Sequence, residues 1–179
     1  MHYLTQVLTE RPRAGEVPEY FLRYTDQVGP GDVRDVLEAQ GREALAKLRA
    51  LPADRSTYAY APGKWTLAEV VAHMSDTERV FAYRAFWFAR ALEGALPGFD
   101  QDAGALTAGA DQTAWPDLLG EFEAVRAATT TLLRGLPSEA WARIGTANQT
   151  QYSVKALAFI MAGHVAHHMR LVDELYVGR

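Results

Sequence analysis

The chain has 179 residues, of which 49% are hydrophobic and 22% are charged, and this balance excludes an intrinsically disordered protein. Lys and Arg together number 18 and Asp and Glu 22, so the net charge of −4 argues against a protein that binds the phosphate backbone of nucleic acids. The absence of cysteine excludes disulfides, thiolate ligands and a cysteine nucleophile, so any metal must be held by nitrogen and oxygen atoms.

The length of the chain matches one domain, because single domains average roughly 150 residues. We therefore expect a single domain over residues 1–179, with a helical core over about 32–178 and a mostly irregular segment over 1–31. No apolar run reaches the roughly 20 residues of a membrane span, and the first residues lack the basic and apolar regions of a signal peptide. These features indicate a cytoplasmic protein that acts on a small molecule, with neither nucleic acid nor membrane as its partner.

Helical periodicity dominates the first half of the chain. A short helix is expected over Pro18–Thr25. Residues 32–51 place apolar side chains at steps of three and four, which predicts the first long helix. The next helix begins after Thr66, because Thr66 and Glu69 have the spacing of a capping box. We expect this second long helix to run to about Leu92, where glycine and proline follow.

The second half of the chain predicts two further long helices. A loop over 97–111 leads to a third helix over about 115–136, and the fourth runs from Ser153, its N-cap, to about Tyr176. Between them, residues 137–152 show no alternating strand pattern and are expected to be irregular apart from a short helix over Ser138–Ala142. Four amphipathic helices joined by connections of this length predict an all-α fold, a four-helix bundle.

Two histidines lie on the apolar face of the fourth helix. The stripe from Val154 to Leu175 keeps steps of three and four, and His164 and His168 belong to it, so both side chains are expected to point inward. Residues four apart have Cβ atoms about 5–6 Å apart, which lets two imidazoles bind one metal ion. The alternative is a pair of hydrogen-bonded core histidines, because a buried imidazole needs partners. His167 lies off the stripe and is expected at its flank.

A third nitrogen ligand would have to come from His2 or His73. His2 lies near the end of the chain, in a segment expected to be mobile, whereas His73 lies two turns into the second long helix. His73 also belongs to a set of motifs that runs through the chain. The segments of this set are Tyr58–Thr66, Glu69–Glu78, Ala82–Arg84, Pro97–Asp100 and Gly163–His168.

Together these motifs resemble those of the DinB-like, or YfiT-like, superfamily of four-helix bundles, from about residue 33 to the end of the chain. The resemblance implies a divalent-metal site formed by His73, His164 and His168, with zinc or nickel as the expected ion. Three neutral ligands leave the ion its full charge and an open position, as in catalytic zinc sites. Such an ion lowers the pKa of bound water toward about 7 or stabilises a thiolate.

Three functions are compatible with such a site. The first is a low-molecular-weight thiol S-transferase, because related bundles resemble bacillithiol and mycothiol S-transferases; the thiol would come from solution. The second is a metal-dependent hydrolase of small amides or esters, and the third is a non-catalytic metal-binding or interaction module, such as a homodimer through exposed aromatic helix faces. The transferase ranks first, because hydrolysis also needs a positioned proton shuttle and no residue outside the ligands stands out for that task.

Two polar residues fall on faces that are expected to be buried. An unpaired charge at Glu78 would be costly, so the sequence predicts a partner, either an imidazole N–H or, as the favoured structural ion pair, Arg84 or Arg170. Gln40 lies on the inner face of the first long helix, where a hydrogen bond between helices is favoured over a contact with the open metal position.

Overall fold

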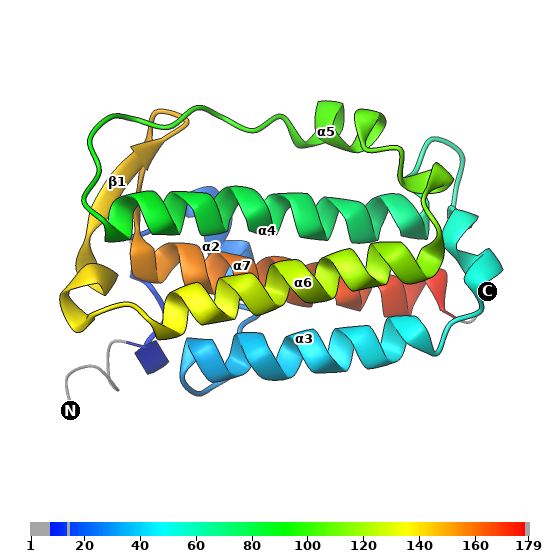
Figure 1. Ribbon diagram of the computed structural model, residues 1–179, viewed down its shortest axis with the longest axis horizontal. Coiled ribbons are helices and arrows are strands. Elements are labelled where there is room, and N and C mark those ends of the chain that lie inside the picture. Colours follow the sequence, from blue (N-terminus) through cyan, green and yellow to red (C-terminus); the bar gives the residue numbers. More distant parts are fainter. Residues whose placement is uncertain (1–7, 14, 178–179) are drawn as a thin grey trace.

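Four long helices form the body of the computed structural model, which describes residues 8–13 and 15–177 (Figure 1). They are α3 (Val33–Arg49), α4 (Leu67–Ala89), α6 (Trp115–Arg134) and α7 (Val154–Leu171). In Figure 1, α3 and α7 run in one direction and α4 and α6 run in the other. Helices α3 and α4 each pack against both α6 and α7. The four-helix bundle predicted from the sequence is therefore confirmed.

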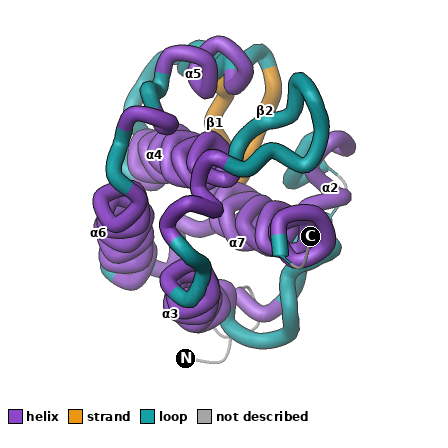
Figure 2. Tube along the Cα trace, turned by 90° about the vertical axis from the view of Figure 1, so that its right-hand side faces the viewer, coloured by secondary structure: helices purple, strands orange, loops and turns teal. Residues whose placement is uncertain are grey.

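Shorter elements connect and cover the long helices. Helix α2 packs on α7, and α5 packs on α4 at the outside of the bundle (Figure 2). The short helices predicted near Pro18 and over Ser138–Ala142 are both present. The short elements are α2 (Glu19–Thr25), η1 (Ala53–Thr57), α5 (Gln101–Thr107), η2 (Ala110–Gln112), η3 (Ser138–Ala142), β1 (Ile144–Ala147), β2 (Thr150–Ser153) and the π-helical turn η4 (Val172–Tyr176).

The predicted helix starts are confirmed by their side-chain hydrogen bonds. The side chains of Asp32, Thr66 and Ser153 each accept a hydrogen bond from a backbone N–H two or three residues further on. At Thr66 the capping box is complete, because the backbone N–H of Thr66 donates to the Glu69 carboxylate at 2.7 Å. The end of α4 was predicted too late, since the helix ends at Ala89 and Ala91 adopts a left-handed conformation with φ of 53°.

Two segments that the sequence analysis expects to be irregular are ordered. Strands β1 and β2 form an antiparallel hairpin, whose turn residues Asn148 and Gln149 both have positive φ. A two-residue turn of this kind matches the twist of a hairpin. Helix α5 lies within the predicted 97–111 loop, and its first turn is capped by Asp100, which accepts hydrogen bonds from the N–H groups of Asp102 and Ala103.

Helix α7 lies at the centre of the molecule. It contacts α2, α3 and α4, and every residue from Val154 to Val165 is buried, so this part of the helix is covered on all sides. Beyond His168 the predicted stripe holds only in part, because Leu171 and Leu175 are half-buried whereas Val172 and Tyr176 are fully buried. Val172 and Tyr176 continue the neighbouring stripe of Val165 and Met169 at steps of three and four, so this face of the helix points inward.

Helix α2 approaches α7 at a glycine. A Cβ atom added to Gly163 would overlap the backbone carbonyl of Tyr24, so only glycine allows this contact between the two helices. Tyr24 therefore lies close to the residue that follows Gly163 on α7, which is His164, with ring centroids 5.7 Å apart. Among the described helices, none combines the length and the apolar character that crossing a bilayer requires.

Candidate metal centre

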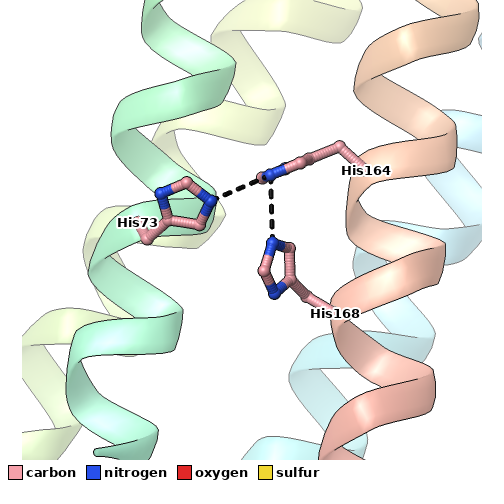
Figure 3. A group of neighbouring side chains, drawn as sticks. All are labelled: His73, His164 and His168. Atoms are coloured by element: carbon pink, nitrogen blue, oxygen red, sulfur yellow. Dashed lines mark hydrogen bonds between the residues drawn. The ribbon is translucent and has the colours of Figure 1, made fainter. Parts of the chain in front are cut away.

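Helices α4 and α7 bring three histidine side chains together inside the bundle (Figure 3). The Nε2 atom of His164 lies 3.0 Å from Nε2 of His73 and 3.1 Å from Nε2 of His168. All three side chains are buried, and each offers a nitrogen within 4.8 Å of the others. The structure thus places side by side the three residues that the motifs nominate, and their role as metal ligands stays a prediction.

Neighbouring residues fix the orientation of His73. The Trp65 ring packs against the imidazole with centroids 4.8 Å apart, and the Thr77 hydroxyl lies 3.4 Å from Nδ1. Thr77 is one helical turn further along α4, so its oxygen can accept a hydrogen bond from an Nδ1–H group. With the proton on Nδ1, the lone pair of Nε2 faces the other two imidazoles, as a metal ligand requires.

Protons alone cannot satisfy this cluster. A neutral imidazole nitrogen carries either one N–H or one lone pair, whereas Nε2 of His164 faces two other ring nitrogens at hydrogen-bond distance. It can therefore form only one full hydrogen bond, and a buried nitrogen without a partner is costly. A cation accepts all three lone pairs at once, and two nitrogens bound to a tetrahedral zinc ion at about 2.0–2.1 Å lie about 3.3 Å apart. The donor set fits a divalent metal ion.

Burial keeps the three imidazoles neutral. Desolvation lowers the pKa of His73 to about 4 and that of His168 to about 3. Desolvation, followed by the neighbouring histidines, places the pKa of His164 well below its ordinary value. Neutral imidazole is the form that binds metals, so near pH 7 the cluster needs to lose no protons before a metal ion binds.

These shifts predict that the metal-free protein is less stable in acid. In the unfolded chain each histidine takes up a proton near pH 6.5, but in the folded protein His73 does so only near pH 4 and His168 near pH 3. Unfolding therefore takes up protons between these values, and the free energy of unfolding falls as pH is lowered from about 6.5, by about 1.4 kcal/mol per pH unit for each histidine.

Denaturant titrations at a series of pH values, with a chelator present, measure this dependence. Because carboxylates also titrate in this range, the comparison is between the wild type and His168→Leu. Between pH 6 and 4, the free energy of unfolding of the variant should fall less steeply with decreasing pH than that of the wild type. The difference in slope is the contribution of one histidine. Equal slopes would show that burial of His168 does not set the acid sensitivity.

Two cavities of about 320 Å³ each flank the histidine cluster, so the cluster is not sealed from small molecules. One reaches His164 and the other reaches His168. The first is lined by Pro18, Tyr20, Phe21, Tyr24, Thr77, Phe81, Arg84, Phe99, Gln101, Asn148, Thr150, Tyr152 and His164. The second is lined by Tyr60, Gly63, Lys64, Trp65, Val70, His168, Leu171 and Tyr176.

Glu78 forms a buried ion pair, as favoured by the sequence analysis, but with a different partner. The guanidinium of Arg126 on α6 donates to the Glu78 carboxylate through Nε and Nη2 at 2.7–3.0 Å. Of the partners expected instead, Arg84 donates to the carbonyl of Pro97, and Arg170 pairs with Glu174 at the surface. No sequence pattern singles out Arg126, because on α6 this residue adjoins the apolar stripe without belonging to it.

Gln40 extends this ion pair to the other two long helices. Its Nε2 donates to the carbonyl of Ala162 on α7 at 2.8 Å, and its Oε1 accepts from Arg126 at 3.2 Å. Arg126 also donates to the carbonyl of Leu37 on α3. The hydrogen bond between helices expected for Gln40 is therefore confirmed. A single polar network therefore joins α3, α4, α6 and α7. It reaches α7 at Ala162, two residues before His164.

The remaining histidines lie outside the cluster. His167 is only partly buried, and its ring meets the edge of Tyr24 with centroids 5.3 Å apart, in keeping with its expected place at the flank. His2, the alternative third ligand, lies outside the residues that the structure describes. The contacts that Trp65 and Thr77 make with His73 are visible only in the folded chain.

Comparison with known proteins relates this geometry to a family. The chain is similar in structure to YfiT from Bacillus subtilis, with a TM-score of 0.66 and 17% sequence identity over 96% of this chain and 95% of that chain. YfiT is described as a probable metal-dependent hydrolase with an unusual four-helix bundle topology, and at this identity the likeness shows the fold alone. A search of curated proteins finds no match. The family model of the DinB superfamily matches residues 30–172, which include all three clustered histidines, and the chain therefore belongs to the DinB superfamily.

Proposed function

We propose that this protein is a divalent-metal-dependent enzyme that transfers a low-molecular-weight thiol to a small electrophile. His73, His164 and His168 would hold the ion, with zinc or nickel as the expected metal. The observation that carries the proposal is the buried cluster of three neutral imidazole nitrogens, which protons alone cannot satisfy, beside a cavity open to small molecules.

For a thiol transfer, the chain would supply the metal ligands and the walls of a cavity that holds the two reactants. A bound divalent cation would supply a positive charge that favours the thiolate form of a thiol. The thiol must come from solution, because the chain contains no cysteine. Aromatic side chains such as Phe21, Phe81 and Tyr152 line the cavity at His164, where they can exclude water and hold an electrophile close to the thiol.

The make-up of the two cavities favours transfer over hydrolysis. A hydrolase needs a group that moves protons to or from water and the leaving group, yet neither cavity has an Asp or Glu among its described lining residues. Glu78 is occupied by Arg126, and Glu69 by the helix cap. Hydrolysis of small amides or esters remains the second candidate, supported by the description of YfiT as a probable metal-dependent hydrolase.

Incubation of the metal-loaded protein with a bacillithiol- or mycothiol-type thiol and a bimane or chlorinated aromatic electrophile tests the proposal. We expect conjugation by the wild type and by His167→Ala, a matched control that removes a histidine outside the cluster. His73→Ala should fall to the uncatalysed rate. Conjugation by the wild type no faster than by His73→Ala would reject the transferase, and turnover of esters or amides by the same wild-type sample would favour the hydrolase.

The non-catalytic alternative is less well supported, because a metal site used only for structure or assembly needs no adjoining cavities. A homodimer through aromatic helix faces stays a prediction. The side chains that would serve it on α4 are Tyr83 and Phe86, which are 49% and 37% exposed. A cytoplasmic location likewise stays a prediction.

A further inference from the structure

Arg84 is a buried cation in the cavity that reaches His164. Only 5% of the residue is exposed, and His73, Thr77, Phe81 and Arg84 follow one another along one face of α4 at steps of four, four and three residues. Thr77 and Arg84 both line the cavity. They are seven residues apart, which corresponds to about 10 Å along the helix axis. The cavity is therefore lined both by a histidine of the cluster, His164, and by a buried arginine, Arg84.

Arg84 has no acidic partner among the residues that the structure describes. Its Nη2 donates to the carbonyl of Pro97 at 3.0 Å, and its guanidinium carbon lies 5.2 Å from the centre of the Phe81 ring. The other buried basic side chains differ in this respect, because Arg126 pairs with Glu78 and Lys155 with Glu16. Burial lowers the pKa of Arg84, which is the direction expected for a cation without a compensating negative charge.

A buried arginine without an anion is costly unless a ligand provides one. A guanidinium has five N–H donors in a planar fork that matches a carboxylate, and the hydrogen bond to Pro97 uses only one of its nitrogens. Gln101, Asn148 and Thr150 add polar groups to the same cavity. Since Arg84 is the one cation in the described lining, its charge suits a monoanion such as a carboxylate.

We propose that this cavity binds a small carboxylic acid, with Arg84 as the residue that anchors the carboxylate. Aromatic side chains on α2, α4 and the hairpin would enclose the apolar part of the molecule, which extends toward His164. One part of the inference rests on the proposed function: in that setting, the apolar part of the acid carries the reacting atom on the side that faces His164. Anion binding by Arg84 does not depend on the metal.

The test uses the metal-free protein, so that a carboxylate cannot bind to a metal ion instead. Isothermal titration calorimetry compares 3-phenylpropionate with its uncharged amide, 3-phenylpropanamide. We expect the acid to bind the wild type at least tenfold more tightly than the amide. Arg84→Gln should remove this difference, whereas Arg90→Gln, which removes an exposed charge on the same helix segment, should preserve it.

Three outcomes would overturn the proposal: no binding of the acid, equal affinities of acid and amide for the wild type, or an equal loss in Arg84→Gln and Arg90→Gln. If Arg84→Gln does not fold, Arg84→Lys decides the question, because lysine keeps the charge but loses the planar fork. That variant should still prefer the acid, with lower affinity than the wild type. Since no metal or thiol is present, failure of the transferase assay would leave this result unaffected.

Discussion

Replacing Glu78 by leucine is expected to lower the free energy of unfolding by about 3–5 kcal/mol. Glu78 and Arg126 are both almost fully buried and pair through two guanidinium nitrogens. Removing only the carboxylate leaves the charge of Arg126 in the middle of the bundle without a partner. Arg126 has little freedom to move away, because Gly41 on α3 packs closely against it. A Cβ atom added to Gly41 would lie 2.8 Å from Cγ of Arg126.

Urea denaturation of the wild type and variants measures this effect. The double variant Glu78→Leu with Arg126→Met should recover most of the loss, because both charges are then replaced by apolar groups of similar size. Glu174→Leu is the matched control, since it breaks the exposed ion pair with Arg170 and should cost at most about 1 kcal/mol. A loss below about 1 kcal/mol for Glu78→Leu would show that the buried pair contributes little to stability.

The second large effect is expected from the metal. Purified protein should carry one divalent ion per chain, and His164→Ala should lose it, because His164 provides the nitrogen that both other histidines approach. A ligand at 1,000 times its dissociation constant stabilises the folded state by about 4 kcal/mol. A chelator should therefore lower the melting temperature of the wild type and leave that of His164→Ala unchanged.

Elemental analysis and thermal melts with and without chelator measure both quantities. His167→Ala is the matched control, because it removes a histidine on the same helix that lies outside the cluster. It should keep the metal and the response to chelator. Unchanged metal content in His164→Ala would remove this residue from the site, and a melting temperature insensitive to chelator in every variant would exclude a bound ion from the folded state.

The long helices and the His164–His168 pair were accessible from the sequence because both depend on local rules. Thr66 and Glu69 are three residues apart and cap a helix wherever they occur in this order. His164 and His168 are four residues apart and must share a face of α7. The proximity of His73 to this pair depends on how α4 packs against α7, and it entered the sequence analysis only through the motifs of the family.

The features that could not be predicted from the sequence depend on contacts between distant segments or on unusual local sequences. Arg126 and Glu78 are 48 residues apart, so nothing local identifies the pair. The hairpin has strands of four residues, too short to show an alternating pattern, and its turn is Asn148–Gln149 in place of the usual Asn-Gly. Helix α5 is a single capped segment of seven residues, which the surrounding glycines conceal.

Helix α2, which lies against α7 at Gly163, lines the cavity but contributes none of the clustered histidines. Helix α2 covers residues 19–25 and contributes Tyr20, Phe21 and Tyr24 to the wall of the cavity at His164, yet it precedes the segment 30–172 matched by the family model. The three clustered histidines all lie within that segment. Residues 19–25 thus help to shape the cavity, whereas the clustered histidines come from α4 and α7. Substitutions in residues 19–25 can therefore change the wall of the cavity while His73, His164 and His168 are kept.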